Sequence, residues 1–240
     1  MRTVALLLVA MATSAPSHAQ SLGDQLGKLF GQSTPTSASV TEPEAAAGVK
    51  EALAQGTRNA VLRLGRKDGF LADQAVRIAT PKSLRKLTKA ARKLGAGAQV
   101  DAFETAMNRA AEQAVPAAAD IFADAVRGMS VQDALGIVRG GEDAGTQYFR
   151  RVSEDRLRTA FTPIVAKATA NTEVTQRYKA LTSKAGGLTA LLGADNTDLD
   201  AYVTDKALDG LFHYVAVEEK AIRSNPLKRG SDLLKRVFGG

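Results

Sequence analysis

The stretch QVDAFETAMNRAAEQAVPAAADIFADAVR, residues 99–127, decides the fold class of this chain. Its apolar side chains recur near the spacing of an α-helix; they are Val100, Phe103, Met107, Ala111, Ala114, Ile121 and Phe122. This period places them on one face, which has to be buried against other elements. Pro116 has no backbone N–H to donate, so it predicts a kink or a break within the stretch.

The helical pattern continues on both sides of this stretch. The predicted helices cover residues 41–65, 72–79, 81–94, 99–127, 130–140, 143–152, 154–170 with a bend near Pro163, 173–184, 199–223 and 233–238. No segment shows the sustained polar–apolar alternation or the β-branched hairpins of strands. The sequence therefore predicts an all-α protein, a compact bundle of about seven to ten helices.

Local signals mark the starts of three of these helices. Thr41 is followed three residues later by Glu44, the spacing of a capping box, and Ser130 with Asp133 resembles another capped start. Asp198 is expected to cap the helix over 199–223, because its carboxylate can accept from free backbone N–H groups. Its neighbours only superficially resemble a calcium loop, since the glycine and the final glutamate of such a loop are missing.

The N-terminus has the pattern of a cleaved secretory signal over residues 1–19. Arg2 precedes the apolar run VALLLVAMA at 4–12, and small residues stand at Ser17 and Ala19. Residues 20–41 then predict a short amphipathic helix and a flexible linker, followed by one helical domain over 42–240. We expect a periplasmic protein without a transmembrane segment. The chain contains no cysteine, so neither a lipid anchor, a disulfide nor a zinc–thiolate site is expected.

Positive charge is concentrated in one predicted helix. The chain has 32 Lys and Arg against 25 Asp and Glu, a mild excess that does not predict a nucleic-acid-binding protein. Residues 81–94, however, carry six cations and no acid: Lys82, Arg85, Lys86, Lys89, Arg92 and Lys93. This face could contact an anionic surface, or it could simply be solvated. The opposite face, with Leu84, Leu87, Ala91 and Leu94, is expected to be buried.

Polar residues at helical spacing form three further candidate sites. Glu104, Asn108 and Glu112 share one face and could bind a cation or act as acid and base, or Glu112 could pair with Arg109 on a solvated face. Asp205, Asp209 and His213 form a second stripe, but once His18 leaves with the signal a three-histidine zinc site is excluded. Near the end of the helix over 199–223, Glu219 and Arg223 have the spacing of an ion pair. Alternatively, Glu218 could lie in a polar pocket where Arg223 binds an anionic ligand.

Several short blocks occur together in this chain in a fixed order. They are MNRAAE at 107–112, DA at 133–134, TQYFR at 146–150, ALDGLF at 207–212, EEKAIRSNP at 218–226 and LLKRVFG at 233–239. Through these blocks, residues 42–239 resemble a family of secreted proteins of Gram-negative bacteria known as domain of unknown function 4197. The resemblance implies a helical, exported envelope protein and brings no activity.

These blocks mix polar with apolar residues and so supply the candidates for one internal polar cluster. The ligand-binding candidates are Asn108, Glu112, Asp133, Thr146, Tyr148, Arg150, Glu218 and Arg223. Nucleophile elbows, phosphate-binding loops, dinucleotide glycine fingerprints and HExxH are all absent, and no cofactor is expected.

Three functions stay open on the sequence alone. The protein could bind a small anionic or lipid-like ligand or an envelope partner. It could instead be a hydrolase with a carboxylate site built from Glu112, Asp133 and Glu218, with or without a divalent metal. Finally, it could be a structural or assembly protein that contacts its partners through residues 20–31 and 81–94.

Overall fold

The structure, a computed structural model, describes residues 41–170, 176 and 198–224, apart from the side chain of Leu87. Every regular element in these ranges is a helix, so the all-α class is confirmed. The predicted signal, almost all of the 20–41 segment, and the predicted helices over 173–184 and 233–238 lie outside the described residues. The total number of helices therefore stays a prediction.

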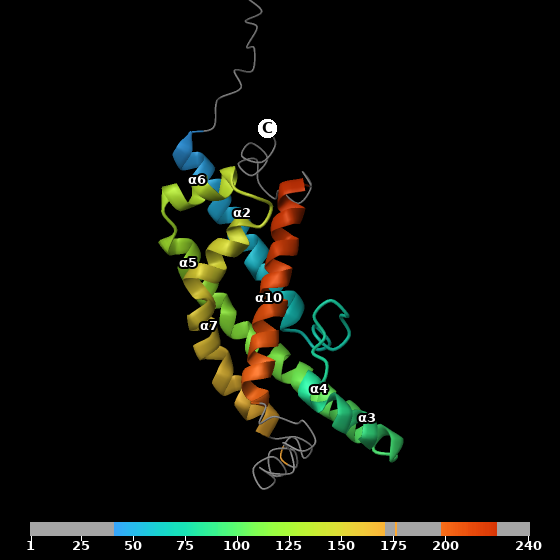
Figure 1. Ribbon diagram of the computed structural model, residues 1–240. Coiled ribbons are helices and arrows are strands. Elements are labelled where there is room, and N and C mark those ends of the chain that lie inside the picture. The colour runs from blue at the N-terminus through green and yellow to red at the C-terminus, as the bar shows by residue number, and fades with distance from the viewer. Residues whose placement is uncertain (1–40, 171–175, 177–197, 225–240) are drawn as a thin grey trace, which may run out of the picture. The chain divides into compact units, whose positions relative to one another are not determined.

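Four long helices pack side by side and carry the shorter ones (Figure 1). The helices are α2 (Glu42–Leu64), η1 (Lys82–Leu84), α3 (Arg85–Lys93), α4 (Gly97–Ala114), η2 (Val115–Ala117), α5 (Ala118–Gly128), α6 (Val131–Arg139), α7 (Ala144–Ala170) and α10 (Leu199–Ser224), where η denotes a 3-10 helix. Helix α10 packs along α7, α2 and α4, while α2 also contacts α5 and α6. The site described below lies where α2, α6, α7 and α10 meet.

The three predicted helix starts are confirmed. The Oγ1 of Thr41 accepts from the backbone N–H of Glu44, whose carboxylate accepts in turn from the backbone N–H of Thr41. Ser130 and Asp133 form the same reciprocal pair at the start of α6. The carboxylate of Asp198 accepts from two backbone N–H groups at the start of α10. These side chains satisfy donors that a helix cannot satisfy internally.

The break predicted at Pro116 is confirmed, but a second predicted break is absent. Helix α4 ends at Ala114, η2 contains Pro116, and α5 begins at Ala118. In contrast, the expected helices over 143–152 and 154–170 form one helix, α7, with Pro163 inside it. The Ser153 hydroxyl donates to the carbonyl of Phe149 one turn earlier, so this polar residue is accommodated within the helix.

The core is built around phenylalanines from three helices. Phe122 of α5 meets Phe149 of α7 and Phe212 of α10 edge to face, with ring centroids 5.1 Å and 6.2 Å apart. All three side chains are fully buried. Alanines fill much of the remaining contact surface, which lets the helix backbones approach closely.

The prediction of a helix over 72–79 is wrong. Residues between α2 and η1 form successive turns, although Phe70, Val76 and Ile78 are buried. A Cβ at Gly210 of α10 would lie 2.6 Å from the Phe70 ring, so α10 needs a glycine where this ring packs. Tertiary contacts, described below, select turns instead.

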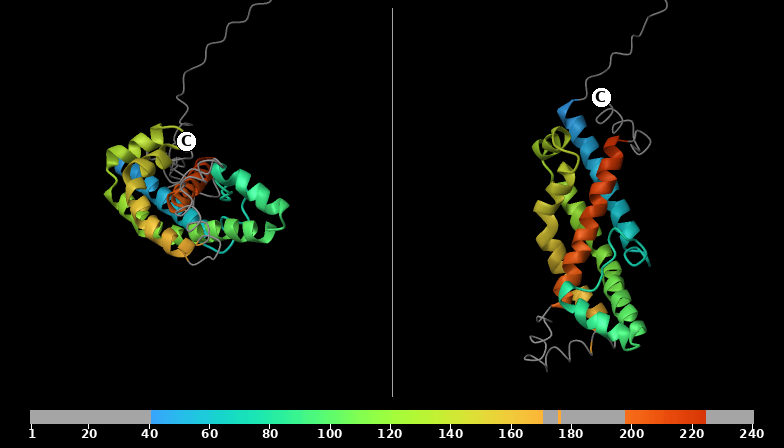
Figure 2. Two further views of the ribbon diagram at one scale, coloured as in Figure 1. Left: turned by 60° about the horizontal axis from the view of Figure 1, so that its bottom comes forward. Right: turned by 45° about the vertical axis from the view of Figure 1, so that its right-hand side comes forward.

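Helix α3 and the start of α4 form a hairpin that extends from the other helices (Figure 2). Leu84 is buried as predicted, but Leu94 is 86% exposed, so the prediction that it is buried is wrong. Gly95 adopts a φ of 83°, and the chain turns directly into α4 at Gly97. Leu94 therefore lies at the tip of the hairpin, beyond the length over which α4 covers α3.

Candidate functional site

A buried carboxylate joins α10 to the first turn of α7. Glu219 is 6% exposed, and its Oε1 accepts from the backbone N–H of Gly145 at 2.9 Å. Its Oε2 accepts from the backbone N–H and the Oγ1 of Thr146, at 2.8 Å and 2.9 Å. These N–H groups belong to the start of α7 and have no partner within that helix. Glu219 thus caps α7 from another helix, where the helix dipole also favours its negative charge.

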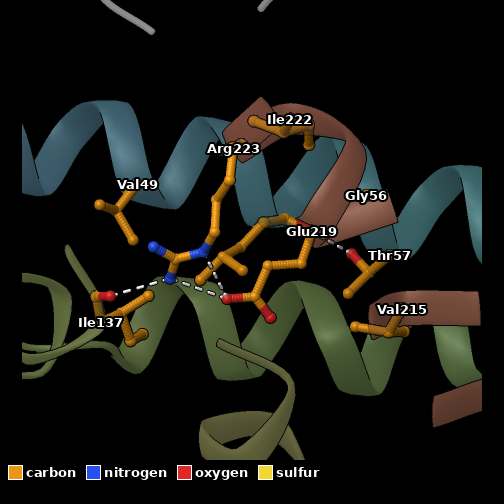
Figure 3. A pocket seen from close by; sticks show the side chains of 10 residues that line it. Val49, Gly56, Thr57, Ile137, Val215, Glu219, Ile222 and Arg223 are labelled. Atoms are coloured by element: carbon orange, nitrogen blue, oxygen red, sulfur yellow. Dashed lines mark hydrogen bonds and ion pairs between the residues drawn. The ribbon is translucent and has the colours of Figure 1, made fainter. Parts of the chain in front are cut away.

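Arg223 extends this junction to a third helix. Its Nη2 lies 2.9 Å from Oε1 of Glu219, which confirms the predicted ion pair, and donates to the carbonyl of Ile137 at 2.8 Å (Figure 3). Ile137 lies in the last turn of α6, and its carbonyl also accepts from the backbone N–H of Gly140 at 3.2 Å. One Glu–Arg pair on α10 therefore holds the end of α6 and the beginning of α7 together.

The space around this pair is too small for a ligand. Apolar residues of α2 and α10, including Val49 and Val215, line a cavity of about 20 Å³ beside Glu219 and Arg223 (Figure 3). A volume of this size holds about one water molecule. A Cβ at Gly145 would lie 2.5 Å from Cδ2 of Leu53 on α2 and 3.1 Å from Oε1 of Glu219 on α10, so both side chains would have to shift to admit it. We interpret this junction as structural.

The sequence paired Glu219 with Arg223 and named the adjacent Glu218 as a ligand-binding candidate; the structure places Glu219 at the junction. The side chain of Glu218 is partly exposed, and its Oε2 accepts from Nδ2 of Asn59 on α2 at 2.9 Å. One residue further along is a rotation of about 100° on a helix, which turns Glu219 inward and Glu218 toward the edge of α2. The signal that identifies Glu219 was its spacing to Arg223.

The polar face of α4 is occupied by the protein's own chain. Asn108 is fully buried; its Oδ1 accepts from the backbone N–H of Ile78 and its Nδ2 donates to the Ile78 carbonyl, both at 2.8 Å. Glu104 accepts from Oγ1 of Thr80 at 2.7 Å. The Asn108 side chain thus supplies the hydrogen-bond partners that the Ile78 backbone would otherwise find in a helix or a sheet.

Glu112 completes this attachment. Its Oε1 accepts from the backbone N–H groups of Phe70 and Leu71 at 3.1 Å and 3.2 Å. Its Oε2 lies 2.6 Å from Arg109, which also pairs with Asp68 at 2.7 Å. The expected pair with Arg109 is confirmed, and the Glu112 side chain is 4% exposed rather than solvated. These contacts hold the segment between α2 and η1 in its turns.

A third group on this segment was not found by sequence reasoning. The Tyr214 hydroxyl donates to Asp73, and Arg63 both pairs with Asp73 at 3.1 Å and lies over the Tyr214 ring. The pKa of Asp73 lies below its ordinary value, mainly because of the Tyr214 hydrogen bond and also because of Arg63. Burial, followed by the hydrogen bond to Asp73, raises the pKa of Tyr214. Arg63 precedes Asp73 by 10 positions and Tyr214 follows it by 141, so no local sequence pattern reveals this group.

Two predicted site residues line a surface hollow between α6 and α7. Asp133 and Tyr148 border a space of about 290 Å³ together with Arg151, whose guanidinium lies 5.4 Å from the Tyr148 ring. The Tyr148 hydroxyl donates to the carbonyl of Ala125 at 3.1 Å. The Ser130 hydroxyl, which donates to Asp133, lowers the pKa of that carboxyl.

The eight predicted site residues thus fall into separate groups. Asn108 and Glu112 hold the segment before η1, and Asp133 and Tyr148 border the hollow. Thr146 and Arg223 both bind the carboxylate of Glu219. Glu218 bonds to α2, and Arg150 lies over the Phe212 ring and pairs with Glu154. The hydrogen bonds among the described residues do not join them into one cluster. Their roles in ligand binding stay a prediction.

The predicted metal stripe on α10 is likewise dispersed. Asp205 pairs with Arg158 of α7, Asp209 pairs with Lys206, and His213 is exposed beside the Tyr214 ring. Within residues 41–170 and 198–224, no three His, Cys, Asp or Glu side chains are placed to hold a metal ion. The three carboxylates proposed for a hydrolase, on α4, α6 and α10, each have other partners.

The cations of the hairpin differ from these engaged groups. All six basic residues of 82–93 are exposed: Lys82, Arg85, Lys86, Lys89, Arg92 and Lys93. In the part of the chain that the structure describes, only Arg92 among them has a carboxylate within ion-pair distance, Asp101 at 2.7 Å. We call residues 82–101 the basic hairpin.

A family model described as "Protein of unknown function (DUF4197)" matches residues 39–239. The chain belongs to the DUF4197 family. The match includes the Glu219 junction, the polar face of α4 and the basic hairpin of this DUF4197 protein. No curated protein and no solved structure matches the chain. Among the described residues, no helix is long and apolar enough to cross a membrane.

Proposed function

We propose that this DUF4197 protein is an exported envelope protein that docks on phosphate-rich anionic surfaces through its basic hairpin. The observation that carries the proposal is the exposed set of six cations on residues 82–93, of which one has a carboxylate partner among the described residues. At helical spacing, Arg85, Lys86, Lys89 and Lys93 share one face of α3. Cations grouped in this way bind a surface of negative charge more strongly than the same cations dispersed.

The rest of the described structure supports a binding role over a catalytic one. Glu112, Asn108 and Glu219, the buried polar side chains most suited to acid–base or ligand chemistry, already bind backbone groups of this chain. A carboxylate whose oxygens already accept several internal hydrogen bonds has little remaining capacity to bind a substrate. The basic hairpin, in contrast, presents five exposed cations for which the described residues offer no carboxylate within ion-pair distance.

The docking proposal is tested with vesicles. Wild-type protein should sediment with vesicles that contain phosphatidylglycerol and not with phosphatidylcholine vesicles, and binding should fall as salt is raised. A Lys86→Gln/Lys89→Gln variant should bind at least tenfold more weakly, because each cation near an anionic surface contributes about fivefold. The matched control is Lys67→Gln/Lys167→Gln, which removes the same charge from exposed positions outside the hairpin. An equal loss in both variants would show that only net charge matters and would refute the proposal.

The proposal of export rests on the signal pattern over 1–19. Cell fractionation and mass spectrometry of the full-length product should find it in the periplasm with Gln20 as its first residue. Retention of residues 1–19 in a cytoplasmic product would refute export without affecting the docking experiment.

A second candidate function is the binding of a small polar ligand in the hollow between α6 and α7. The hollow is lined by Arg151, Asp133 and Tyr148 together with the small residues Gly136 and Ala144. This arrangement suits a ligand with both an anionic and a cationic group. A thermal-shift screen of free amino acids and short peptides should show stabilisation that Arg151→Gln abolishes. A shift that survives this substitution would place the ligand elsewhere.

A further inference from the structure

The tip of the basic hairpin carries no charge and ends in the most exposed large apolar side chain of the described residues. Leu94 is 86% exposed, compared with 67% for Leu62, the next of its kind. The turn that follows, Gly95 to Ala98, contains only glycine and alanine. The first charged residues on either side of the tip are Lys93 and Asp101.

Cations surround this uncharged tip. Arg92 and Lys93 lie in the last turn of α3, immediately before Leu94, and Lys89 lies one turn earlier; all three are exposed. The carboxylate of Asp101, the nearest acid along the chain, is paired with Arg92. Net positive charge therefore remains next to the apolar tip, on Lys89 and Lys93. Residues 82–101 contain no aromatic residue, so the basic hairpin offers no side chain on which nucleic-acid bases could stack.

The placement of the tip makes it accessible to a flat surface. Helix α3 packs mainly on α4 and η1, and the hairpin extends from the remaining helices (Figures 1 and 2). A surface that touches the turn can therefore reach Leu94 and the last-turn cations together. A single exposed leucine is common on proteins, but here it stands at the end of a projecting basic element.

We infer that the anionic surface is a lipid bilayer, into which the 94–98 tip inserts while Lys89 and Lys93 bind lipid phosphates. The inference rests on the proposed docking function and names its partner. A soluble polyanion would satisfy the cations and leave Leu94 in water. A bilayer interface satisfies both, because its phosphates lie directly above an apolar layer. The hairpin is then an interfacial anchor, and the rest of the domain stays in the aqueous phase.

The first experiment uses the absence of tryptophan from this chain. Leu94→Trp introduces a single tryptophan at the tip, which can be excited selectively over the tyrosines, and Leu62→Trp introduces one at the other exposed leucine. With phosphatidylglycerol vesicles, the emission of Leu94→Trp should shift to shorter wavelength and become protected from an aqueous quencher. The emission of Leu62→Trp should not change. Equal behaviour of the two variants, whether both shift or neither does, would overturn the inference.

The second experiment separates the tip from the charge. Leu94→Gln should weaken partitioning into phosphatidylglycerol vesicles roughly five- to tenfold, since the apolar contribution of a partly inserted leucine is lost. The same variant should bind soluble polyphosphate as strongly as wild type does. Leu62→Gln is the matched control and should partition as wild type. Leu94 is exposed, so far-ultraviolet circular dichroism and the melting temperature should be unchanged.

The outcomes distinguish this inference from the proposed function. If Leu94→Gln partitions as wild type while Lys86→Gln/Lys89→Gln binds weakly, docking stands and insertion is refuted. If polyphosphate binds tightly and vesicles of either lipid do not, the surface is a soluble polyanion and the bilayer inference is refuted. If no anion binds, both fail.

Discussion

The Glu219 junction makes the strongest prediction about stability. Replacing Glu219 by Gln keeps the size of the side chain but removes its charge and turns one acceptor oxygen into a donor. Five hydrogen bonds reach this carboxylate: one from the Gly145 N–H, two from Thr146 and two from the Arg223 guanidinium. An amide oxygen can keep only some of them, while the new NH₂ group faces further donors.

The size of the effect follows from what stays buried. Arg223 has a side chain that is 17% exposed, so it would lose its counter-charge largely out of water. Breaking a buried ion pair by removing one partner costs about 3–5 kcal/mol. Because the glutamine retains one acceptor, we expect Glu219→Gln to lower the free energy of unfolding by about 2–3 kcal/mol. Glu219→Ala should reach the full 3–5 kcal/mol.

Equilibrium urea denaturation, followed by circular dichroism at 222 nm, measures this loss. Glu218→Gln is the matched control, because it makes the same chemical change one residue earlier, where a single hydrogen bond to Asn59 is partly exposed. It should cost less than about 1 kcal/mol. Hydrogen exchange at the Gly145 and Thr146 amides should accelerate only in Glu219→Gln. If the two glutamine variants differ by less than about 0.5 kcal/mol, Glu219 does not cap α7, and our interpretation of the junction is wrong.

Three further predictions concern the segment between α2 and η1 and its contacts. Asn108→Ala should lower the free energy of unfolding, measured by urea denaturation, by about 2–3 kcal/mol, because the buried backbone N–H and carbonyl of Ile78 lose their partners. A loss below about 0.5 kcal/mol would show that water replaces the Asn108 amide. Gly210→Ala should lower the melting temperature, because overpacking against the Phe70 ring costs about 1–3 kcal/mol of unfolding free energy. Gly136→Ala is the control: a Cβ there meets nothing within 4 Å, so the unfolding free energy should rise by roughly 0.5–1 kcal/mol. Equal effects of the two substitutions would contradict the close contact at Gly210. The lowered pKa of Asp73 adds stability above its unfolded value of about 3.9 that is lost as the pH falls through the lower folded value. Tyr214→Phe removes the main cause of this shift, so its deficit in unfolding free energy relative to wild type should be larger at pH 6 than at pH 2, and a deficit independent of pH would refute the coupling.

The anchoring of the segment before η1 shows where sequence reasoning stops. Glu104, Asn108 and Glu112 were recognised as one polar face from their spacing, and that placement is right. Their partners, the Thr80 hydroxyl and the backbone of Ile78, Phe70 and Leu71, lie 24 to 42 residues earlier, and no local pattern specifies them. A polar stripe looks the same in sequence whether it binds water, a metal ion or another part of the chain. Only the fold brings the Ile78 and Phe70 backbone to it.

The family match over 39–239 agrees with the resemblance inferred from short blocks, and the structure gives some of those blocks a physical purpose. The block at 107–112 supplies Asn108 and Glu112, and the block at 218–226 supplies Glu219 and Arg223. Their polar residues join helices to one another and to the segment before η1. Mixed polar and apolar blocks in a helical protein therefore do not by themselves indicate a ligand site.

By itself, the sequence determined what depends on neighbouring residues. Helical periodicity, the Thr41 and Ser130 caps and the break at Pro116 act over one or two turns, where backbone geometry and hydrogen bonding are local. Tertiary structure decided the rest. It turned Glu219 rather than Glu218 inward, replaced a helix over 72–79 by turns, and left Leu94 at the uncovered tip of a hairpin. Each of these depends on which distant element lies opposite a side chain, and packing of the whole domain sets that.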